Sequence, residues 1–110
     1  MREALDRVRD LRRAGFGCLP HYDEHGEMVA VQAVRVRAGH IETVLIWGEH
    51  DALAARCRDD DHAEVVWHQA GATADAIAAL LDLPGPGTRH APALARTAPT
   101  DLWLPQPFGR

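Results

Sequence analysis

Apolar side chains near the start of the chain recur at helical spacing, whereas further along they alternate with polar ones or run together as they do in strands. The first pattern predicts an amphipathic helix over residues 3–14. Its apolar stripe consists of Ala4, Leu5, Val8 and Leu11. Gly15 follows the stripe, and glycine readily adopts the left-handed backbone conformation that ends many helices. We therefore expect the helix to stop there.

Three strand-like segments come next, separated by residues that favour turns. The predicted strands are residues 16–22, 28–37 and 41–47. Residues 23–26 and 37–40 have the polar and glycine content of hairpin turns, so the three strands should form an antiparallel meander. Pro20 has no N–H to donate to a ladder, which favours an edge position for the first strand.

A helix and a fourth strand are predicted after the meander. Asp51 or Glu49 can cap a short helix that continues through Arg58. β-Branched and aromatic residues then predict a strand over residues 64–69. Because a helical crossover would join this strand to the meander, we expect it to run parallel to the third or the first strand.

A last helix and an extended tail complete the chain. Thr73 can cap this helix, which should run to about Leu83 before the alternating prolines and glycines of residues 84–87 end it. All but one of the seven prolines lie beyond residue 83, and no helical or strand period is visible there. The tail still carries large apolar side chains, namely Leu102, Trp103, Leu104 and Phe108.

The predicted element order is therefore α-β-β-β-α-β-α. The predicted fold class is α+β, with a mixed, mainly antiparallel four-stranded sheet and an extended proline-rich C-terminal tail. Residues 1–83 should form the single α+β domain. Residues 84–110 should form the tail, docked on that domain because its apolar side chains are costly to leave in water.

The second hairpin fixes a register between the strands at residues 28–37 and 41–47. A short loop sets Val36 opposite Ile41, so Arg35 faces Glu42, a favourable cross-strand pair of opposite charges. A slip by one residue would turn every side chain to the other face. The same register pairs Val34 with Thr43, Ala33 with Val44 and Val31 with Ile46.

This register divides the side chains between two faces. The face that we expect the two longer helices to cover consists of Met28, Ala30, Gln32, Val34, Val36, Ile41, Thr43, Leu45 and Trp47. The second face is polar near the hairpin tip but apolar at its other end, where it holds Val29, Val31, Ala33, Val44 and Ile46. A one-sided antiparallel sheet would be polar there, so this apolar area needs a cover. The cover could be the tail, the short helix ending at Arg58, a second copy of the chain or another protein.

Protein association is the function that this pattern favours. We expect a small non-catalytic module that acts as a homodimer or an accessory subunit. The predicted interface consists of Val29, Val31, Ala33, Val44, Ile46, Trp103 and Phe108.

The alternative is a small-molecule-binding domain or a minor enzyme with a site on the second face. Its candidate residues are Arg35, Arg37, His40, Glu42 and His68. The two arginines would bind an anionic group, and His68 would move protons.

Composition and charge exclude several classes. The chain has 110 residues and a net charge of −4 with neutral histidines, and all 12 basic residues are arginine. The absence of serine and lysine rules out a serine hydrolase, a Schiff-base lysine and a Walker phosphate loop. The negative charge argues against a nucleic-acid binder. The element order resembles that of double-stranded RNA-binding domains in outline. Those domains bind phosphates with a lysine-rich helix start, and this chain has no lysine.

Metal and thiol chemistry have little support in the sequence. His21, Asp23, Glu24 and His25 lie close together, but their spacing spans a turn and fixes no ligand geometry, so we predict no metal and no cofactor. The two cysteines lie far apart, with no signal peptide before them. No apolar run approaches the roughly 20 residues that span a bilayer. We therefore expect a cytoplasmic protein with free thiols and no membrane contact.

Overall fold

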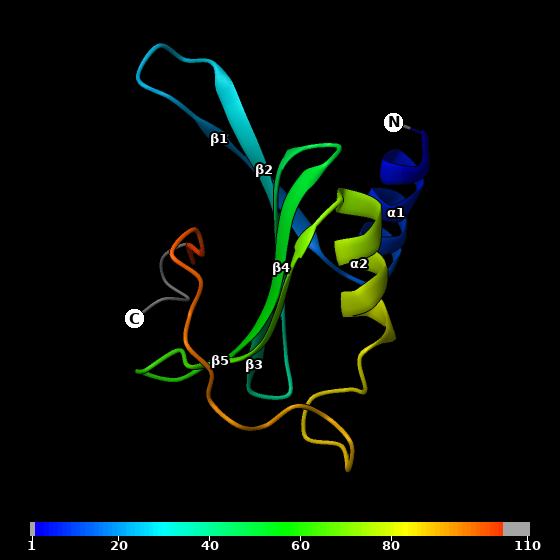
Figure 1. The fold of residues 1–110 in the computed structure, drawn as a ribbon, viewed down its shortest axis with the longest axis vertical. Coiled ribbons are helices and arrows are strands. Elements are labelled where there is room, and N and C mark those ends of the chain that lie inside the picture. The colour runs from blue at the N-terminus through cyan, green and yellow to red at the C-terminus, as the bar shows by residue number, and fades with distance from the viewer. Residues whose placement is uncertain (1, 105–110) are drawn as a thin grey trace.

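Five antiparallel strands form one sheet, and two helices pack on one of its faces (Figure 1). The computed structural model describes residues 2–104. The elements are α1 (Arg2–Arg13), β1 (Gly17–Tyr22), β2 (Met28–Arg37), β3 (His40–Gly48), β4 (Asp51–Arg58), β5 (Val65–Gly71) and α2 (Thr73–Asp82). The strands lie in chain order, β1-β2-β3-β4-β5, and each pairs antiparallel with the next. The fold is thus α+β, but the prediction of a mixed four-stranded sheet is wrong.

The error lies in residues 51–58, which were predicted as a helix and form β4 instead. This alanine-rich segment is a central strand between β3 and β5, and residues Ala52–Cys57 are all buried. A strand covered on both faces shows no apolar–polar alternation, and tertiary packing overrides the helix propensity of alanine. Because no helix crosses over at this point, β5 runs antiparallel to β4 rather than parallel to an earlier strand.

The predicted register between β2 and β3 is confirmed. Val36 pairs with Ile41, and Arg35 pairs with Glu42. Both residues of the tight turn between these strands have positive φ, 49° at Ala38 and 72° at Gly39, as a type I′ hairpin turn requires. The edge position of Pro20 is also confirmed, because β1 pairs only with β2.

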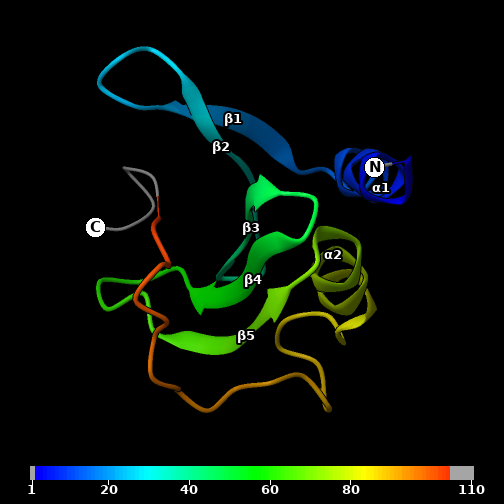
Figure 2. The ribbon, with the colours of Figure 1, turned by 45° about the horizontal axis from the view of Figure 1, so that its top comes forward.

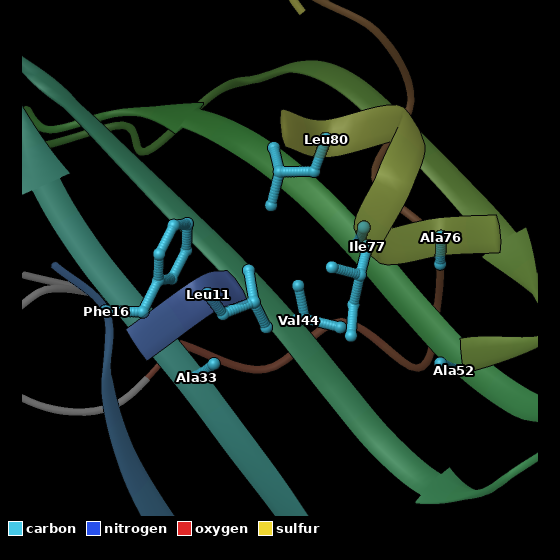
Figure 3. Packing of buried hydrophobic residues seen from close by; sticks show 9 residues of the cluster. Leu11, Phe16, Ala33, Val44, Ala52, Ala76, Ile77 and Leu80 are labelled. Atoms are coloured by element: carbon cyan, nitrogen blue, oxygen red, sulfur yellow. The ribbon is translucent and has the colours of Figure 1, made fainter. Parts of the chain in front are cut away.

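The helices cover the face opposite to the one predicted. α1 and α2 pack on Ala33, Val44, Ala52 and Ala54 through Leu11, Ala76, Ile77 and Leu80 (Figure 3). We call this side of the sheet the helix face. Its alanines leave room for the helices to approach closely. Both faces of the sheet carry apolar side chains, so their pattern could not show which one the helices would choose.

The tail crosses the other side of the sheet, which we call the tail face (Figure 2). Arg96 forms a bridge with Val65 of β5, its N–H donating to the Val65 carbonyl at 2.7 Å. Further along, Leu102 and Leu104 pack on Ala55, Cys57 and Val65. The described helices include none long and apolar enough to cross a membrane.

α2 also begins differently from the prediction. Its N-cap residue is Ala72, with no side-chain cap, and not Thr73. The Thr73 hydroxyl instead donates to the carbonyl of Gly48 at 2.7 Å, and the Thr73 N–H donates to the carbonyl of Glu49 at 2.9 Å. These two bonds tie the start of α2 to the β3–β4 turn.

Candidate functional site

An apolar groove lies at the end of the sheet where β2 begins and β3 ends. α1 forms one wall through Ala4, Leu5 and Val8. β2, β3 and the start of α2 form the rest, with Met28, Val29, Ala30, Val31, Ile46, Trp47, Gly48, Glu49 and Thr73. The volume is about 310 Å³, which is within the range of small ligand pockets.

Several apolar side chains of the groove are exposed to solvent. The exposed fraction is 50% for Leu5, 60% for Met28 and 47% for Val29, and Trp47 is exposed to 39%. The Thr73 hydroxyl at its rim is already bonded to a backbone carbonyl. The groove therefore offers contact with apolar surface and shape rather than directional hydrogen bonds.

A hairpin arm projects beside this groove. We define the arm as residues 21–30, in which β1 and β2 pair with each other beyond the last pair that β2 makes with β3, Val31 with Ile46 (Figure 1). Every residue from Tyr22 to Val29 is exposed. At the tip, a carboxylate oxygen of Asp23 accepts the N–H groups of His25 and Glu27 at 2.8 and 3.0 Å, which holds the turn.

A buried ion cluster lies towards the other end of β2 and β3. Glu42 is fully buried, and three arginines surround its carboxylate. Arg35 donates to Oε1 through Nε and Nη2 at 2.9 and 2.7 Å, and Arg37 donates to the same oxygen through Nε at 3.0 Å. Arg56, also fully buried, donates to Oε2 through Nε and Nη2 at 3.0 and 2.7 Å.

Two arginines of this cluster also donate hydrogen bonds to the backbone next to the helices. Arg35 donates to the carbonyl of Ala14 at the end of α1, and Arg56 donates to the carbonyl of Pro84 just after α2. Burial alone would raise the pKa of Glu42, but the hydrogen bonds from the three arginines outweigh it and hold the pKa below its ordinary value of 4.5. The cluster therefore ties both helices to a carboxylate in the sheet whose ionised form the three arginines stabilise.

The structure brings together three of the five candidate ligand-binding residues, Arg35, Arg37 and Glu42. His40 starts β3 at the same hairpin, and its ring nitrogen Nδ1 lies 2.9 Å from the carbonyl oxygen of Ala38. His68 is not brought to them. His68 lies on β5 and pairs with Ala55 of β4. Because Ala55 belongs to the tail face, His68 lies on the side of the sheet opposite to the arginines.

The predicted interface residues are divided among three places. Ala33 and Val44 are buried beneath the helices, whereas Val29, Val31 and Ile46 line the groove. Trp103 lies on the tail face, where its ring meets the ring of His21 edge-on at 4.6 Å between centroids. Phe108 lies outside the described residues.

Two important residues escaped the sequence analysis. Arg56 was hidden by the predicted helix, which gave it no place in the sheet. Gln32 was assigned only to a face, yet its buried amide is the centre of a network. The amide nitrogen donates to Thr43 Oγ1 at 3.0 Å and to the carbonyl of Trp103 at 2.9 Å, and the amide oxygen lies 2.9 Å from Nε2 of His21. A single glutamine among apolar strand residues was the available signal.

A smaller hollow of about 190 Å³ adjoins this network on the tail face. Trp103, His21 and Asp101 line it together with Val29, Ala30 and Trp47, the three residues that it shares with the groove. Across residues 2–104, no three His, Cys, Asp or Glu side chains gather as a metal-ion site.

Comparison of the chain with known protein families, curated proteins and solved structures finds no match.

Proposed function

We propose that this protein is a small non-catalytic association module that binds a protein partner through the apolar groove between α1 and the β2–β3 strands. The observation that carries the proposal is the set of exposed apolar side chains around a concave, almost wholly apolar surface. Apolar patches of this kind on small proteins mark interaction sites, because water around them is released on binding.

The contrast with the rest of the sheet supports this choice. On the helix face, Ala33 and Val44 are covered by α1 and α2. On the tail face, Leu102 and Leu104 cover Cys57 and its neighbours. Among the residues that the structure describes, neither the helices nor the tail closes over the groove. As part of the same proposal we place the protein in the cytoplasm, where two unpaired thiols such as its own persist.

The alternative, an anion or proton-transfer site at the arginines, receives less support from the geometry. Both carboxylate oxygens of Glu42 accept hydrogen bonds from arginines of the cluster, and Arg35 and Arg56 each donate one further bond to a backbone carbonyl. His68, the proposed proton carrier, lies on the other side of the sheet. We therefore favour the groove.

Binding of Nile red, a neutral apolar dye, to dilute protein tests whether the groove is an open apolar binding surface. Val29→Gln removes an apolar side chain from the groove, and Val36→Gln is the matched control on the same strand, with similar exposure, 42% against 47%. We expect wild type and Val36→Gln to bind the dye alike. Val29→Gln should bind about tenfold more weakly, since burying a valine side chain is worth about 1.5 kcal/mol or more.

The proposed function fails if the wild type does not bind the dye, or if both substitutions weaken binding equally. Far-UV circular dichroism of the three proteins checks that each keeps its fold, because both valines lie in a strand.

A further inference from the structure

We propose that the occupant of the groove is the arm of a second copy of this chain, so that two copies form a symmetric dimer in which each arm lies in the groove of the other. This inference rests on the proposed function and names the partner of the same site. Three features carry it: the exposure of the arm, its charge, and its position beside the groove.

The outer part of the arm, residues 22–29, is exposed, although His21 at its base meets the ring of Trp103. From His21 paired with Ala30 outward, β1 and β2 form a ribbon to which no third strand pairs within residues 2–104 (Figures 1 and 2). Isolated two-stranded hairpins are marginally stable in water. Tyr22 and Met28 are cross-strand partners on this ribbon, and they are exposed to 61% and 60%. Packing against a second molecule would bury both side chains and brace the ribbon.

The charges of the arm and of α1 are complementary. The arm tip carries three carboxylates, on Asp23, Glu24 and Glu27, against one histidine. α1 carries five arginines against three acidic residues. Its existing ion pairs use Arg7, Arg9 and Arg13.

Arg2 and Arg12 are the arginines of α1 that have no carboxylate partner within residues 2–104. Arg12 lies seven residues, or about two turns, after Leu5 and so on the same side of the helix, and Arg2 lies about one turn before Leu5. An arm that enters a partner's groove would bring its acidic tip to these two guanidinium groups. The two segments of one chain are thus suited to each other in a second copy.

The position of the arm allows both contacts to form at once. Met28 and Val29 belong to the arm and also line the groove at its base. The arm and the groove therefore lie at the same end of the molecule. A twofold axis at this end would seat both arms together in one closed, self-complementary interface. Because such an interface uses both arms and both grooves, a third copy could not add to it.

Sedimentation velocity on the full chain, from about 1 µM to about 1 mM, tests the dimer over the range of moderate to weak affinities. The arm variant is Tyr22→Glu, and the groove variant is Leu5→Glu. Leu94→Glu is the matched control, because Leu94 is exposed to 81% in the tail and lines neither arm nor groove. We expect wild type and Leu94→Glu to become dimers with rising concentration, and the other two variants to remain monomers.

A mixing experiment then tests the reciprocal exchange itself. In an equimolar mixture of Tyr22→Glu and Leu5→Glu, an intact arm of one chain meets an intact groove of the other. The mixture should therefore associate at concentrations at which neither variant does so alone. A general loss of folding would give no such complementation.

Several results would overturn the dimer. They are a wild type that stays monomeric throughout, arm and groove variants that dimerise like wild type, and a mixture that does not associate. Nile red bound by a wild type that remains monomeric would remove the dimer and leave the proposed function standing. A chain ending at Leu104 that gains both dye binding and association would instead assign the groove to residues 105–110 of the same chain.

Discussion

Glu42 shows how much one side chain organises this fold. Its carboxylate joins β2 and β4 through Arg35 and Arg56, and the same arginines reach the carbonyls that follow each helix. Every buried side-chain polar atom in the described part of the chain has a hydrogen-bond partner. Removal of this one acceptor would leave several of those donors without a partner inside the protein.

Replacement of Glu42 by glutamine should therefore destabilise the fold strongly. We expect the free energy of unfolding to fall by about 3–5 kcal/mol, because the fully buried Arg56 would lose its counter-charge. Glu64→Gln is the control, since the Glu64 carboxylate pairs with a partly exposed arginine, Arg58, and should cost less than about 1 kcal/mol. Urea unfolding of the three proteins measures both values. If both variants lost the same free energy of unfolding, the buried cluster would contribute no more to stability than an exposed ion pair.

The lowered pKa of Glu42 predicts a definite acid dependence. Its folded pKa lies below the ordinary 4.5, so its ionisation stabilises the fold above that pH, and the contribution is lost as the pH falls through the folded value. Arg37→Gln removes one donor from Oε1 and keeps Arg35 and Arg56. In urea melts from about pH 6 to about pH 2, this variant should lose less stability on acidification than the wild type. The prediction would be contradicted if the free energy of unfolding of Arg37→Gln fell with pH as steeply as that of the wild type.

Ala38 is the other residue with a measurable consequence. Its φ of 49° is unfavourable for alanine, whereas asparagine tolerates this conformation and is preferred there in type I′ turns. Ala38→Asn should raise the free energy of unfolding by about 1 kcal/mol. Ala95→Asn, in the exposed tail, should bring no gain. Urea unfolding distinguishes the two, and a destabilised Ala38→Asn would contradict the turn geometry.

At the scale of elements, β4 is where prediction from sequence reached its limit. The first helix, the β2–β3 register and the edge position of β1 follow from local periods and turn residues, and all three are confirmed. β4 does not follow, because a strand buried on both faces carries no alternation, and its alanines favour a helix when read locally. Once β4 was missed, Arg56 could not be placed beside Glu42.

The choice of faces illustrates a second limit. The register correctly separated Val31 and Ala33 from Gln32 and Val34, but it could not say which group the helices would cover. That choice depends on β4, whose Ala52 and Ala54 extend the helix face. For the same reason the groove was predicted only in part. Three of its residues, Val29, Val31 and Ile46, were predicted as interface, whereas the wall that α1 forms was not.

The tail can be tested as an element through the buried thiol beneath it. Burial raises the pKa of Cys57 to about 11, and Leu102 and Leu104 pack over its cluster, whereas Cys18 is exposed. In a Cys18→Ala background, Ellman's reagent should react slowly with the intact chain. It should react much faster when the chain ends after Arg96, which keeps the bridge to Val65. Equal reaction rates, with circular dichroism unchanged, would contradict a covering role for the tail.

For the whole molecule, charge should govern solubility near neutral pH. The net charge is −4 with neutral histidines, and protonation of the seven histidines turns its sign positive. The net charge therefore passes through zero near the isoelectric point of the sequence, about 5.9. We expect turbidity of concentrated protein to peak near there. A flat turbidity between about pH 5 and about pH 7 would contradict this.

The groove is the most consequential surface at this scale, and concentration-dependent hydrogen exchange tests it most directly. Backbone amides of residues 4–8 in α1 and of residues 22–31 in the arm and β2 should become more protected between about 1 µM and about 1 mM protein. Amides of β4 and β5 beneath the tail should not change. Protection that is the same at all concentrations, or that rises only at the edge of β5, would contradict the assignment of the groove as the place where this chain meets its partner.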